Sequence, residues 1–253
     1  MKKSKIAVLV AMVVVLAFSL AACGGSDKSS SDKTVYKVGT EPTFPPFDTT
    51  DEDQNIVGLD MDLIKAIGED QGFDVEFENL SFDGLIPALK AGNIDIVAAG
   101  MNKDDEDRQK EVDFSDSYYE SKLFVAVTED NTTIKSVEDL TPDMKVAAQT
   151  GTTGASKVKE LKDAGKIKEA VILDGLDTCM MKLINGDVSA VINDKPVTEA
   201  YMKKQPDKIK MVGEALNAEN YGFAVQKGNA ELVEKINNGL KNIKENGTYD
   251  KLV

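Results

Sequence analysis

The sequence predicts an α/β protein built as two lobes, each a mostly parallel sheet with flanking helices. Short apolar segments typical of buried strands alternate with amphipathic helical segments, first over 36–98 and again over 145–226. The hydrophobic fraction of 42% and the charged fraction of 29% are ordinary for a globular protein with a packed core. The 220 or so residues that follow an N-terminal apolar run are enough for two small domains (roughly 100 residues each).

The N-terminus has the pattern of a signal peptide, which we place at residues 1–22. A lysine-rich start precedes an uncharged apolar run over 6–20 that is too short to span a bilayer comfortably. The run ends in Leu-Ala-Ala-Cys, which resembles a bacterial lipoprotein signal. Cys23 would then carry the lipid (palmitate) and begin the mature chain, which would be extracytoplasmic and anchored to the membrane. The alternative is an ordinary cleaved signal. Residues 23–33 have the composition of a flexible tether.

The first α/β series follows the tether. A strand is expected at 36–39, a helix at 60–71 with Asp60 as its N-cap and Gly72 at its end, and a strand at 75–78. A second helix is expected from Ser81 to Gly92, followed by a buried strand at 95–98. This order is typical of parallel strands joined by helices.

The second series repeats the alternation. Expected strands are 145–148, 171–173, 188–193, 209–212 and 221–226; expected helices run from a turn at 149–154 to about 164, over 176–185, from Pro196, and over 230–246. Two α/β lobes follow from these series, and the crevice between such lobes is a usual place for a small ligand.

Arg108 is the most informative single residue. It is the one arginine of the chain, in which lysine supplies every other cation. A guanidinium binds a carboxylate through two parallel hydrogen bonds, which an ammonium cannot do. It also follows a predicted strand end, where α/β proteins hold their ligands. An ordinary solvated surface charge is the competing interpretation.

Composition excludes several classes of function. The net charge of −14 argues against nucleic acid and anionic lipid as partners. The absence of histidine excludes histidine-based catalytic triads and the common zinc sites. Cys179, the one cysteine beyond Cys23, lies in an apolar helical segment and is expected in the core, so no disulfide is predicted.

Two loop motifs imitate cofactor sites without matching them. The segment GTTGASK lacks the spacing of a phosphate-binding loop. Asp51, Asp53 and Asn55 resemble the start of a calcium loop, but Ile56 stands where that loop needs glycine, so a solvated hairpin tip is the better interpretation. No metal and no cofactor are expected.

Seven segments, taken in order, resemble the family 3 (polar amino-acid) substrate-binding proteins of ABC importers. They cover most of the chain after the tether: VGTEPTFPPFD (38–48), VGLDMDLIKAI (57–67), FDGLIPALKAGNIDIVAAGM (82–101), VDFSDSYY (112–119), AAQTGTTG (147–154), AVINDKP (190–196) and YGFAVQKGNAELVEKINNGLKNIKENGTYDKL (221–252). Seven motifs in one order are far more specific than any one of them.

The resemblance implies a periplasmic-binding-protein fold of type II, with two lobes joined by two crossing strands. Lobe 1 would comprise 34–126 and 216–253, and lobe 2 would comprise 127–215. The lobes would close on the ligand by a hinge motion and deliver it to a permease. The protein would be a monomer, would bind no nucleic acid, and would touch the membrane only through its lipid anchor.

The resemblance also implies a ligand site. Arg108 would bind the ligand carboxylate, together with Thr153 at a helix N-terminus, and Asp194 would bind the α-ammonium. Ala99 and Gly100 would offer backbone groups. The ligand side chain would lie between the rings of Phe44 and Phe82. Its tip would contact two polar residues, Glu41 and Gln149. Taken alone, the two phenylalanines could be core residues, and Asp194 could be a helix N-cap.

The sequence departs from the family pattern beside Arg108. Asn102 stands where the family usually has threonine, and Arg108 is eight residues after Gly100 rather than seven. Asn102 keeps a side-chain carbonyl and amide that can serve the site. The chain also ends without the aromatic-rich tail that is common in the family.

The ligand class remains open between several choices. Glu41 favours a cationic or amide side chain (arginine, lysine or glutamine), and cystine is an alternative. A sensing lipoprotein that serves a receptor is a second alternative. A cyclohexadienyl-type dehydratase, the enzyme alternative on this fold, would need a second cation in the site, so we expect no enzyme.

Overall fold

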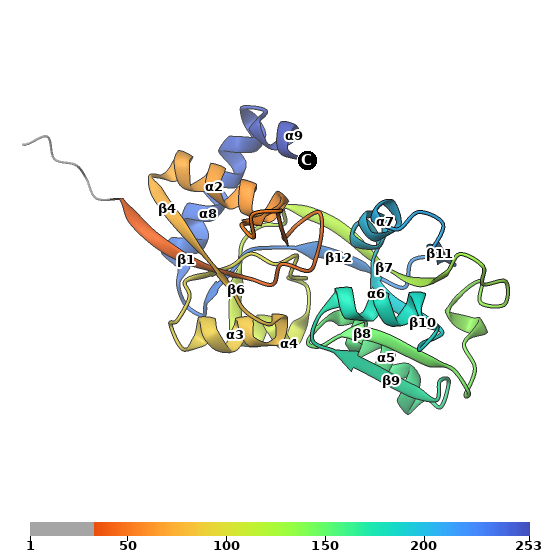
Figure 1. Cartoon of the computed structure of the whole chain (residues 1–253). Helices are drawn as coiled ribbons and strands as arrows, with labels where there is room; N and C mark the ends of the chain where they lie inside the picture. Colours follow the sequence, from red (N-terminus) through yellow and green to blue (C-terminus); the bar gives the residue numbers. More distant parts are fainter. Residues whose placement is uncertain (1–32) are drawn as a thin grey trace, which may run out of the picture. The chain divides into compact units, whose positions relative to one another are not determined.

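The computed structural model describes residues 33–253, and Thr34–Val253 form one compact unit with two principal sheets (Figure 1). The predicted signal peptide, Cys23 and nearly all of the tether lie outside the described residues. Within 33–253 no helix is both long enough and apolar enough to cross a membrane.

The first sheet has five strands in the order β4-β1-β5-β13-β6. The strand β1 is parallel to β4 and β5, whereas β13 is antiparallel to β5 and β6. The strands are β1 (Thr34–Thr40), β4 (Phe73–Asn79), β5 (Ile96–Val97), β6 (Val112–Phe114) and β13 (Ala224–Gln226). The accompanying helices are α2 (Leu59–Gln71), α3 (Phe82–Lys90), α4 (Glu106–Glu111), α8 (Ala230–Glu245) and α9 (Thr248–Leu252).

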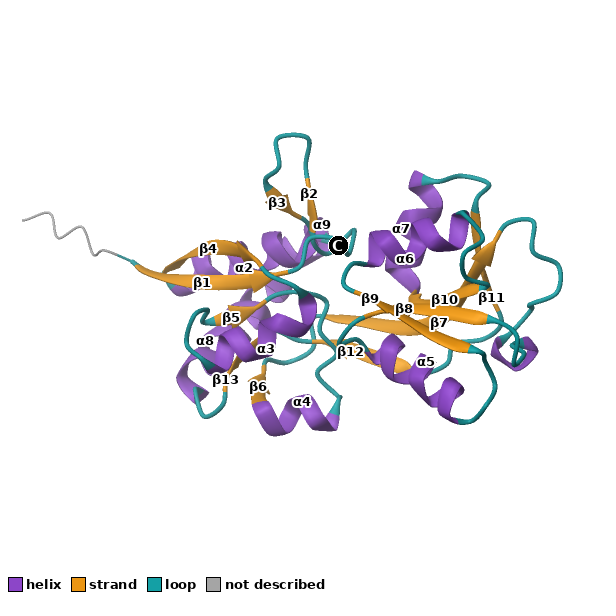
Figure 2. Ribbon diagram, turned by 60° about the horizontal axis from the view of Figure 1, so that its bottom comes forward, coloured by secondary structure: helices purple, strands orange, loops and turns teal. Residues whose placement is uncertain are grey.

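The second sheet has the order β11-β7-β10-β8-β9, with β12 pairing beside β7. Its strands β10, β8 and β9 are parallel, with β9 at the edge, and β7 runs antiparallel to its neighbours. The strands are β7 (Tyr119–Thr128), β8 (Lys145–Gln149), β9 (Glu169–Leu173), β10 (Ala190–Asp194), β11 (Ile209–Val212) and β12 (Ala218–Tyr221). Helices α5 (Thr153–Asp163), α6 (Leu176–Ile184) and α7 (Lys195–Lys204) accompany this sheet (Figure 2), and a 3₁₀ turn spans Val137–Asp139.

The chain passes between the two sheets along β7 and β12, which pair antiparallel from Tyr119↔Tyr221 to Lys122↔Ala218. The lobe boundaries predicted at 126/127 and 215/216 fall within β7 and just before β12. Sheets flanked by helices confirm the predicted α/β fold class. Both sheets are mixed rather than mostly parallel, since four of their strand pairings are parallel and five are antiparallel. Division into two lobes at those residues stays a prediction.

Apolar packing explains why these segments fold as they do. In α8, Leu232, Ile236, Leu240 and Ile243 are buried at helical spacing. Gly239 lets this helix approach α2, because a Cβ there would lie 2.7 Å from a methyl carbon of Ile67. The second sheet has its own cluster of buried aliphatic residues, among them Val125, Val146 and Ile192. Cys179 is a free, buried core residue, as predicted.

The loop that contains Asp51, Asp53 and Asn55 is a hairpin tip, as predicted. Strands β2 (Thr49–Thr50) and β3 (Ile56–Val57) pair antiparallel across it. The carboxylate of Asp51 accepts hydrogen bonds from the backbone N–H groups of Asp53 and Asn55. Its oxygens therefore stabilise the turn itself.

The prediction that Asp60 caps a helix is wrong. The N-cap of α2 is Gly58, and Asp60 is fully buried inside the first turn. Gly58 has φ 137°, and a Cβ there would lie 2.2 Å from the carbonyl oxygen of Phe47. Only glycine fits this close approach, so the helix begins earlier than the preference of aspartate for N-caps suggested.

The predicted single strand at 221–226 is two strands. The strand β12 ends at Tyr221 and β13 begins at Ala224, and they pair with different sheets. Two short helices, α4 and α9, were not predicted. Both are six residues or fewer and have too little periodicity to be recognised.

Candidate functional site

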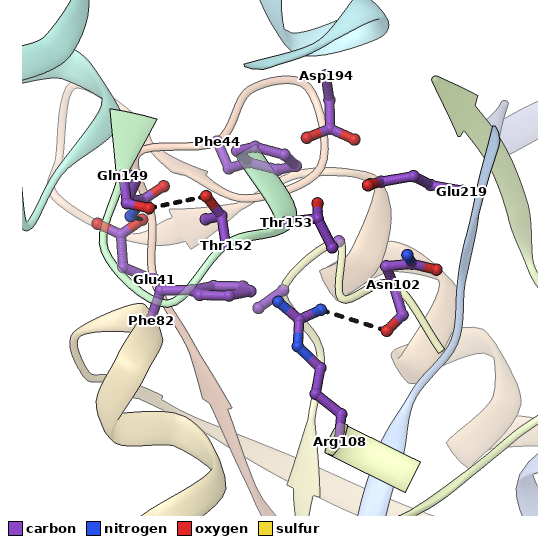
Figure 3. A pocket seen from close by; sticks show the side chains of 12 residues that line it. Glu41, Phe44, Phe82, Asn102, Arg108, Gln149, Thr152, Thr153, Asp194 and Glu219 are labelled. Carbon is purple, nitrogen blue, oxygen red and sulfur yellow. Dashed lines mark hydrogen bonds between the residues drawn. The ribbon is translucent and has the colours of Figure 1, made fainter. Parts of the chain in front are cut away.

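One cavity brings together all ten residues predicted for the site (Figure 3). Its lining comes from both sheets and from the helices beside them. The residues are Glu41, Phe44, Phe82, Ala99, Gly100, Asn102, Arg108, Gln149, Thr153 and Asp194, joined by Thr152 and Glu219.

Arg108 is a buried cation without an acidic partner. It lies on α4, whose N-cap Asp105 accepts hydrogen bonds from the N–H groups of Asp107 and Arg108. The guanidinium donates to the carbonyls of Asn102 (3.2 Å) and Gly151 (2.9 Å). Burial lowers the pKa of Arg108 from its ordinary value. Among residues 33–253 no carboxylate lies within ion-pair distance of Arg108, so its direct partners are two neutral carbonyls. Asp105, Glu219 and Asp194 act on it from farther away and partly offset the effect of burial on its pKa.

Asp194 presents the opposite charge at the end of β10. It occupies the N-cap position of α7, but its side chain makes no capping hydrogen bond. One carboxylate oxygen instead accepts from Tyr221 Oη (2.5 Å) and Ser121 Oγ (3.1 Å). Burial raises the pKa of Asp194 well above its ordinary value, and the nearby Glu219 carboxyl raises it further. No lysine or arginine of the described chain forms an ion pair with it, although Arg108 is near enough for Asp194 to raise the pKa of the guanidinium.

Glu219 is a site residue that the sequence did not reveal. It lies on β12, is 2% exposed, and accepts a hydrogen bond from Asn217 Nδ2 (3.0 Å). In Figure 3 its carboxylate lies on the same side of the cavity as Asp194. It is 25 residues away from Asp194 in the sequence, and no local motif marks it.

The N-terminus of α5 forms another wall. Thr152 is the N-cap, and its hydroxyl accepts from the N–H of Ala155 (3.0 Å) and donates to the carbonyl of Gln149 (2.7 Å). Thr153, the first residue of the helix, lines the cavity as predicted. The helix dipole and free N–H groups at such an end favour an anion. Its capping pattern (threonine before a helix) was the signal that could have identified Thr152.

Phe44 and Phe82 face the cavity from different segments (Figure 3). Phe82 is the first residue of α3, and the guanidinium of Arg108 lies 5.4 Å from its ring centroid. Phe44 is 7% exposed and also contacts Phe47 and Tyr221 in the core. Phe44 is therefore both a core residue and a lining residue, so the two interpretations offered for it are compatible.

Glu41 and Gln149 lie together at the far end from Glu219 (Figure 3). Gln149 Nε2 donates to Glu41 Oε2 (2.9 Å) and to the carbonyl of Asp174 (3.0 Å), and Thr43 Oγ1 also donates to Glu41 (2.8 Å). Burial raises the pKa of Glu41, while the hydrogen bonds from Gln149 and Thr43 lower it. Both side-chain donors to this carboxylate, Gln149 and Thr43, are neutral.

The backbone of the β5–α4 connection completes the cavity. Asn102 Oδ1 accepts from the N–H groups of Asp104 (3.1 Å) and Asn220 (3.3 Å), which ties this loop to β12. The N–H of Gly100 donates to Asp60 (2.8 Å), so this donor is already engaged by the protein. Of the two backbone groups that Gly100 was predicted to offer to a ligand, the carbonyl therefore remains.

The charges are arranged at opposite parts of one small cavity. A cation and a helix N-terminus lie near each other, two carboxylates lie on one side, and a third carboxylate lies at the other end. Buried charges are costly unless paired. This arrangement suits a ligand that carries both a carboxylate and ammonium-type groups. Among residues 33–253 no group of acidic or cysteine side chains has the geometry of a metal site.

The family model for bacterial extracellular solute-binding proteins, family 3, matches residues 36–253. The chain belongs to this family. A probable histidine-binding protein of Neisseria gonorrhoeae is 34% identical to this family 3 protein over 245 residues, which cover 93% of this chain and 90% of the relative.

Solved structures show the same fold at higher identity. An ancestral arginine-binding protein bound to arginine is 45% identical with a TM-score of 0.83, and covers 87% of this chain and 96% of its own. An ancestral arginine-binding protein bound to glutamine is 46% identical with a TM-score of 0.80. The match covers 87% of this chain and 96% of that protein. An ancestral amino acid-binding protein described as a precursor of cyclohexadienyl dehydratase is 39% identical with a TM-score of 0.79, and covers 86% of this chain and 93% of its own.

Proposed function

We propose that this family 3 protein captures a free polar amino acid outside the cytoplasm and delivers it to an ABC importer. The observation that carries the proposal is the pair of buried groups of opposite charge type that form no ion pair within residues 33–253. Arg108 donates to two backbone carbonyls, and Asp194 accepts from two hydroxyl groups. An α-amino acid supplies the opposite charge to each, with its carboxylate at Arg108 and Thr153 and its ammonium at Asp194.

The side chain of the ligand is proposed to be cationic, with arginine or lysine preferred over glutamine. Glu41, Asp194 and Glu219 give the lining three carboxylates against one guanidinium. A ligand with two positive charges and one negative charge balances this excess better than a neutral side chain does. The ligand side chain would pass between Phe44 and Phe82 to reach Glu41. Two similar solved structures are bound to arginine and to glutamine, and one relative is named for histidine. These proteins therefore support a polar amino acid as the ligand more strongly than they support any one amino acid.

Capture is proposed to involve hinge closure of two lobes, 34–126 with 216–253 and 127–215. The paired strands β7 and β12 would carry the hinge. Contacts that span the predicted lobes support this, since Gln149 donates to Glu41 and Tyr201 Oη donates to the carbonyl of Thr43 (3.0 Å). Lipidation at Cys23, a monomeric state and a permease partner complete the proposal.

Catalysis is not proposed. A dehydratase acting on a cyclic dicarboxylic acid needs a second cation for the second carboxylate, and Arg108 is the one cation among the residues that line the cavity. Glu41 and Glu219 would repel that group instead.

The test is a calorimetric panel on purified protein that has been unfolded and refolded to remove carried ligand. L-arginine, L-lysine, L-histidine, L-glutamine, L-cystine and L-glutamate are titrated under one set of conditions. We expect arginine or lysine to bind tightest, glutamine more weakly, and glutamate weakest. No binding by any of the six would overturn the proposal. Tightest binding by cystine or glutamine would keep amino-acid capture and overturn the preference for a cationic side chain.

A further inference from the structure

Thr43 lies behind the cavity lining and contacts one of the lining carboxylates. It is half-buried in the connection between β1 and β2, two residues after Glu41. Its hydroxyl donates to Glu41 Oε2 (2.8 Å) and accepts from the N–H of Leu176 (3.3 Å), the first residue of α6. Because a backbone N–H can only donate and an ionised carboxylate can only accept, the hydroxyl proton has one direction, toward Glu41.

The backbone and the methyl group of Thr43 are also held by helices beside the second sheet. Tyr201 Oη, on α7, donates to the carbonyl of Thr43 (3.0 Å). The methyl group faces the N-cap of α6, since a Cβ on Gly175 would lie 3.9 Å from it. Glu41 and Thr43 themselves follow β1 of the first sheet. Thr43 is therefore a point at which α6 and α7 act on a binding carboxylate that the first sheet carries.

The two side-chain donors to Glu41 bond the same oxygen. Gln149 Nε2, at the end of β8, donates to Oε2 (2.9 Å) and also to the carbonyl of Asp174 (3.0 Å), and Figure 3 shows Gln149 beside Glu41. Among residues 33–253 no side chain donates to Glu41 Oε1. The protein thus holds this carboxylate by Oε2 and leaves Oε1 able to accept from a ligand.

We propose that Thr43 is a positioning residue for ligand specificity, whose hydroxyl holds the Glu41 carboxylate at the tip of the ligand side chain. This inference rests on the proposed function, in which Glu41 distinguishes a cationic tip from a neutral one. Without the hydroxyl, Glu41 keeps one side-chain donor and regains rotamer freedom. A cationic side chain then loses a fixed counter-charge, whereas a neutral side chain, which gains little from that charge, loses little.

The ionised form of Glu41 depends on neutral donors. Burial raises the pKa of Glu41, and the hydrogen bonds from Gln149 and Thr43 oppose that effect. The titratable groups that act on Glu41 or are affected by its charge come from α6, from the β1–β2 connection and from α7, and they are Asp177, Asp48 and Tyr201. None of these three is a cation, so removal of the Thr43 hydroxyl is expected to raise the pKa of Glu41.

The specificity role is tested by calorimetry with L-arginine and L-citrulline, whose side chains have nearly the same shape and differ by one positive charge. Thr43→Val removes the hydroxyl and keeps the branched shape that packs against α6. We expect its affinity for L-arginine to fall by about fivefold while its affinity for L-citrulline changes by less than about twofold. Thr43→Ser, which restores the hydroxyl, should keep the wild-type ratio of the two dissociation constants within about twofold. Thr132→Val, at an exposed threonine, is the matched control.

Tyr201→Phe is the second variant, and it decides the matter should Thr43→Val fail to fold. It removes the hydroxyl that donates to the Thr43 carbonyl and leaves the Thr43 side chain in place. We expect L-arginine binding to weaken relative to L-citrulline by about threefold, because Thr43 is then held by α6 alone.

The contact itself is tested without ligand by following the side-chain carboxyl carbon of Glu41 in ¹³C NMR as the pH is varied. We expect Glu41 to titrate at a higher pH in Thr43→Val than in the wild type, because the hydrogen bond from Thr43 favours the ionised form. In Thr43→Ser it should titrate as in the wild type. The same pH of titration in Thr43→Val and the wild type would show that the hydroxyl does not hold Glu41.

An unchanged ratio of the two dissociation constants in Thr43→Val, or in Tyr201→Phe if that variant alone folds, would overturn the specificity role. Equal losses for both ligands would also overturn it, because Thr43 would then support binding in general and not the recognition of charge. Failure of the wild type to bind either ligand would overturn the proposed function and with it the specificity role, while the NMR titration would still decide whether Thr43 holds Glu41.

Discussion

The two ends of the cavity recognise a ligand in different ways. At one end Arg108, Asp194 and Glu219 are buried charges, and neither Arg108 nor Asp194 has an oppositely charged partner in the described chain. At the other end Glu41 is already hydrogen-bonded by Gln149 and Thr43. The hydrogen-bond partners of Arg108, Asp194 and Glu41 are all neutral, so the two ends differ in the sign of the charges they hold. The first end holds both signs, which matches the carboxylate and ammonium that all amino acids share, whereas the second holds a carboxylate alone. The first end should therefore determine the class of ligand, and the second should select among its members.

The largest expected effect is at Arg108. Arg108→Lys keeps the charge but removes the planar fork, and we expect the affinity for L-arginine to fall by about 100-fold, or roughly 2.7 kcal/mol. Isothermal calorimetry measures this. Lys110→Ala, an exposed cation on the same helix, is the control and should not change affinity. If Arg108→Lys binds like the wild type, Arg108 is not the carboxylate partner.

A substitution of Asp194 tests the negative charge at the same end of the cavity as Arg108. Asp194→Asn removes the counter-charge of the ammonium while its shape and its hydrogen bond from Tyr221 can be kept. We expect a loss of about 2 kcal/mol, close to 30-fold, in the dissociation constant for any amino acid that binds. Asp187→Asn, an exposed aspartate in the turn before β10, is the matched control. Undiminished binding by Asp194→Asn would reassign the ammonium to Glu219.

Glu41 tests the selecting end. Glu41→Gln removes the negative charge at the ligand tip, and we expect binding of L-arginine to weaken by about tenfold while binding of L-glutamine changes by less than about threefold. The quantity to measure is the ratio of the two dissociation constants, with Glu52→Gln on the exposed β2–β3 hairpin as the control. Equal losses for both ligands would show that Glu41 does not read side-chain charge.

The smallest effect is expected at Thr152, which shapes the site through the helix behind it. Thr152→Ala removes the N-cap bond to Ala155 and should cost about 1 kcal/mol of stability, which lowers Tm by about 2–4 °C. Differential scanning calorimetry measures this, with the exposed Thr132→Ala as the control. An unchanged Tm would show that the α5 N-terminus is held by its packing alone.

Sequence reasoning predicted most of this site because its residues lie in ordered motifs at strand ends and helix starts. Arg108 could be predicted as a site residue from its chemistry, since the chain contains one arginine. Glu219 could not be predicted from the sequence, because it reaches the cavity only through the pairing of β12 with β7. Asp60 was misassigned because the preference of aspartate for N-caps is a local property, whereas its partners Gly100 and Tyr118 are 40 and 58 residues away.

The central claim is that the buried guanidinium of Arg108 recognises the carboxylate of an amino acid. The most direct measurement compares L-arginine with agmatine, which keeps both cationic groups but has no carboxylate, in the wild type and in Arg108→Ala. The account predicts a loss of about 2 kcal/mol or more on going from arginine to agmatine in the wild type, and nearly none in Arg108→Ala. Equal losses in the two proteins would show that the carboxylate is bound elsewhere, and would contradict the account.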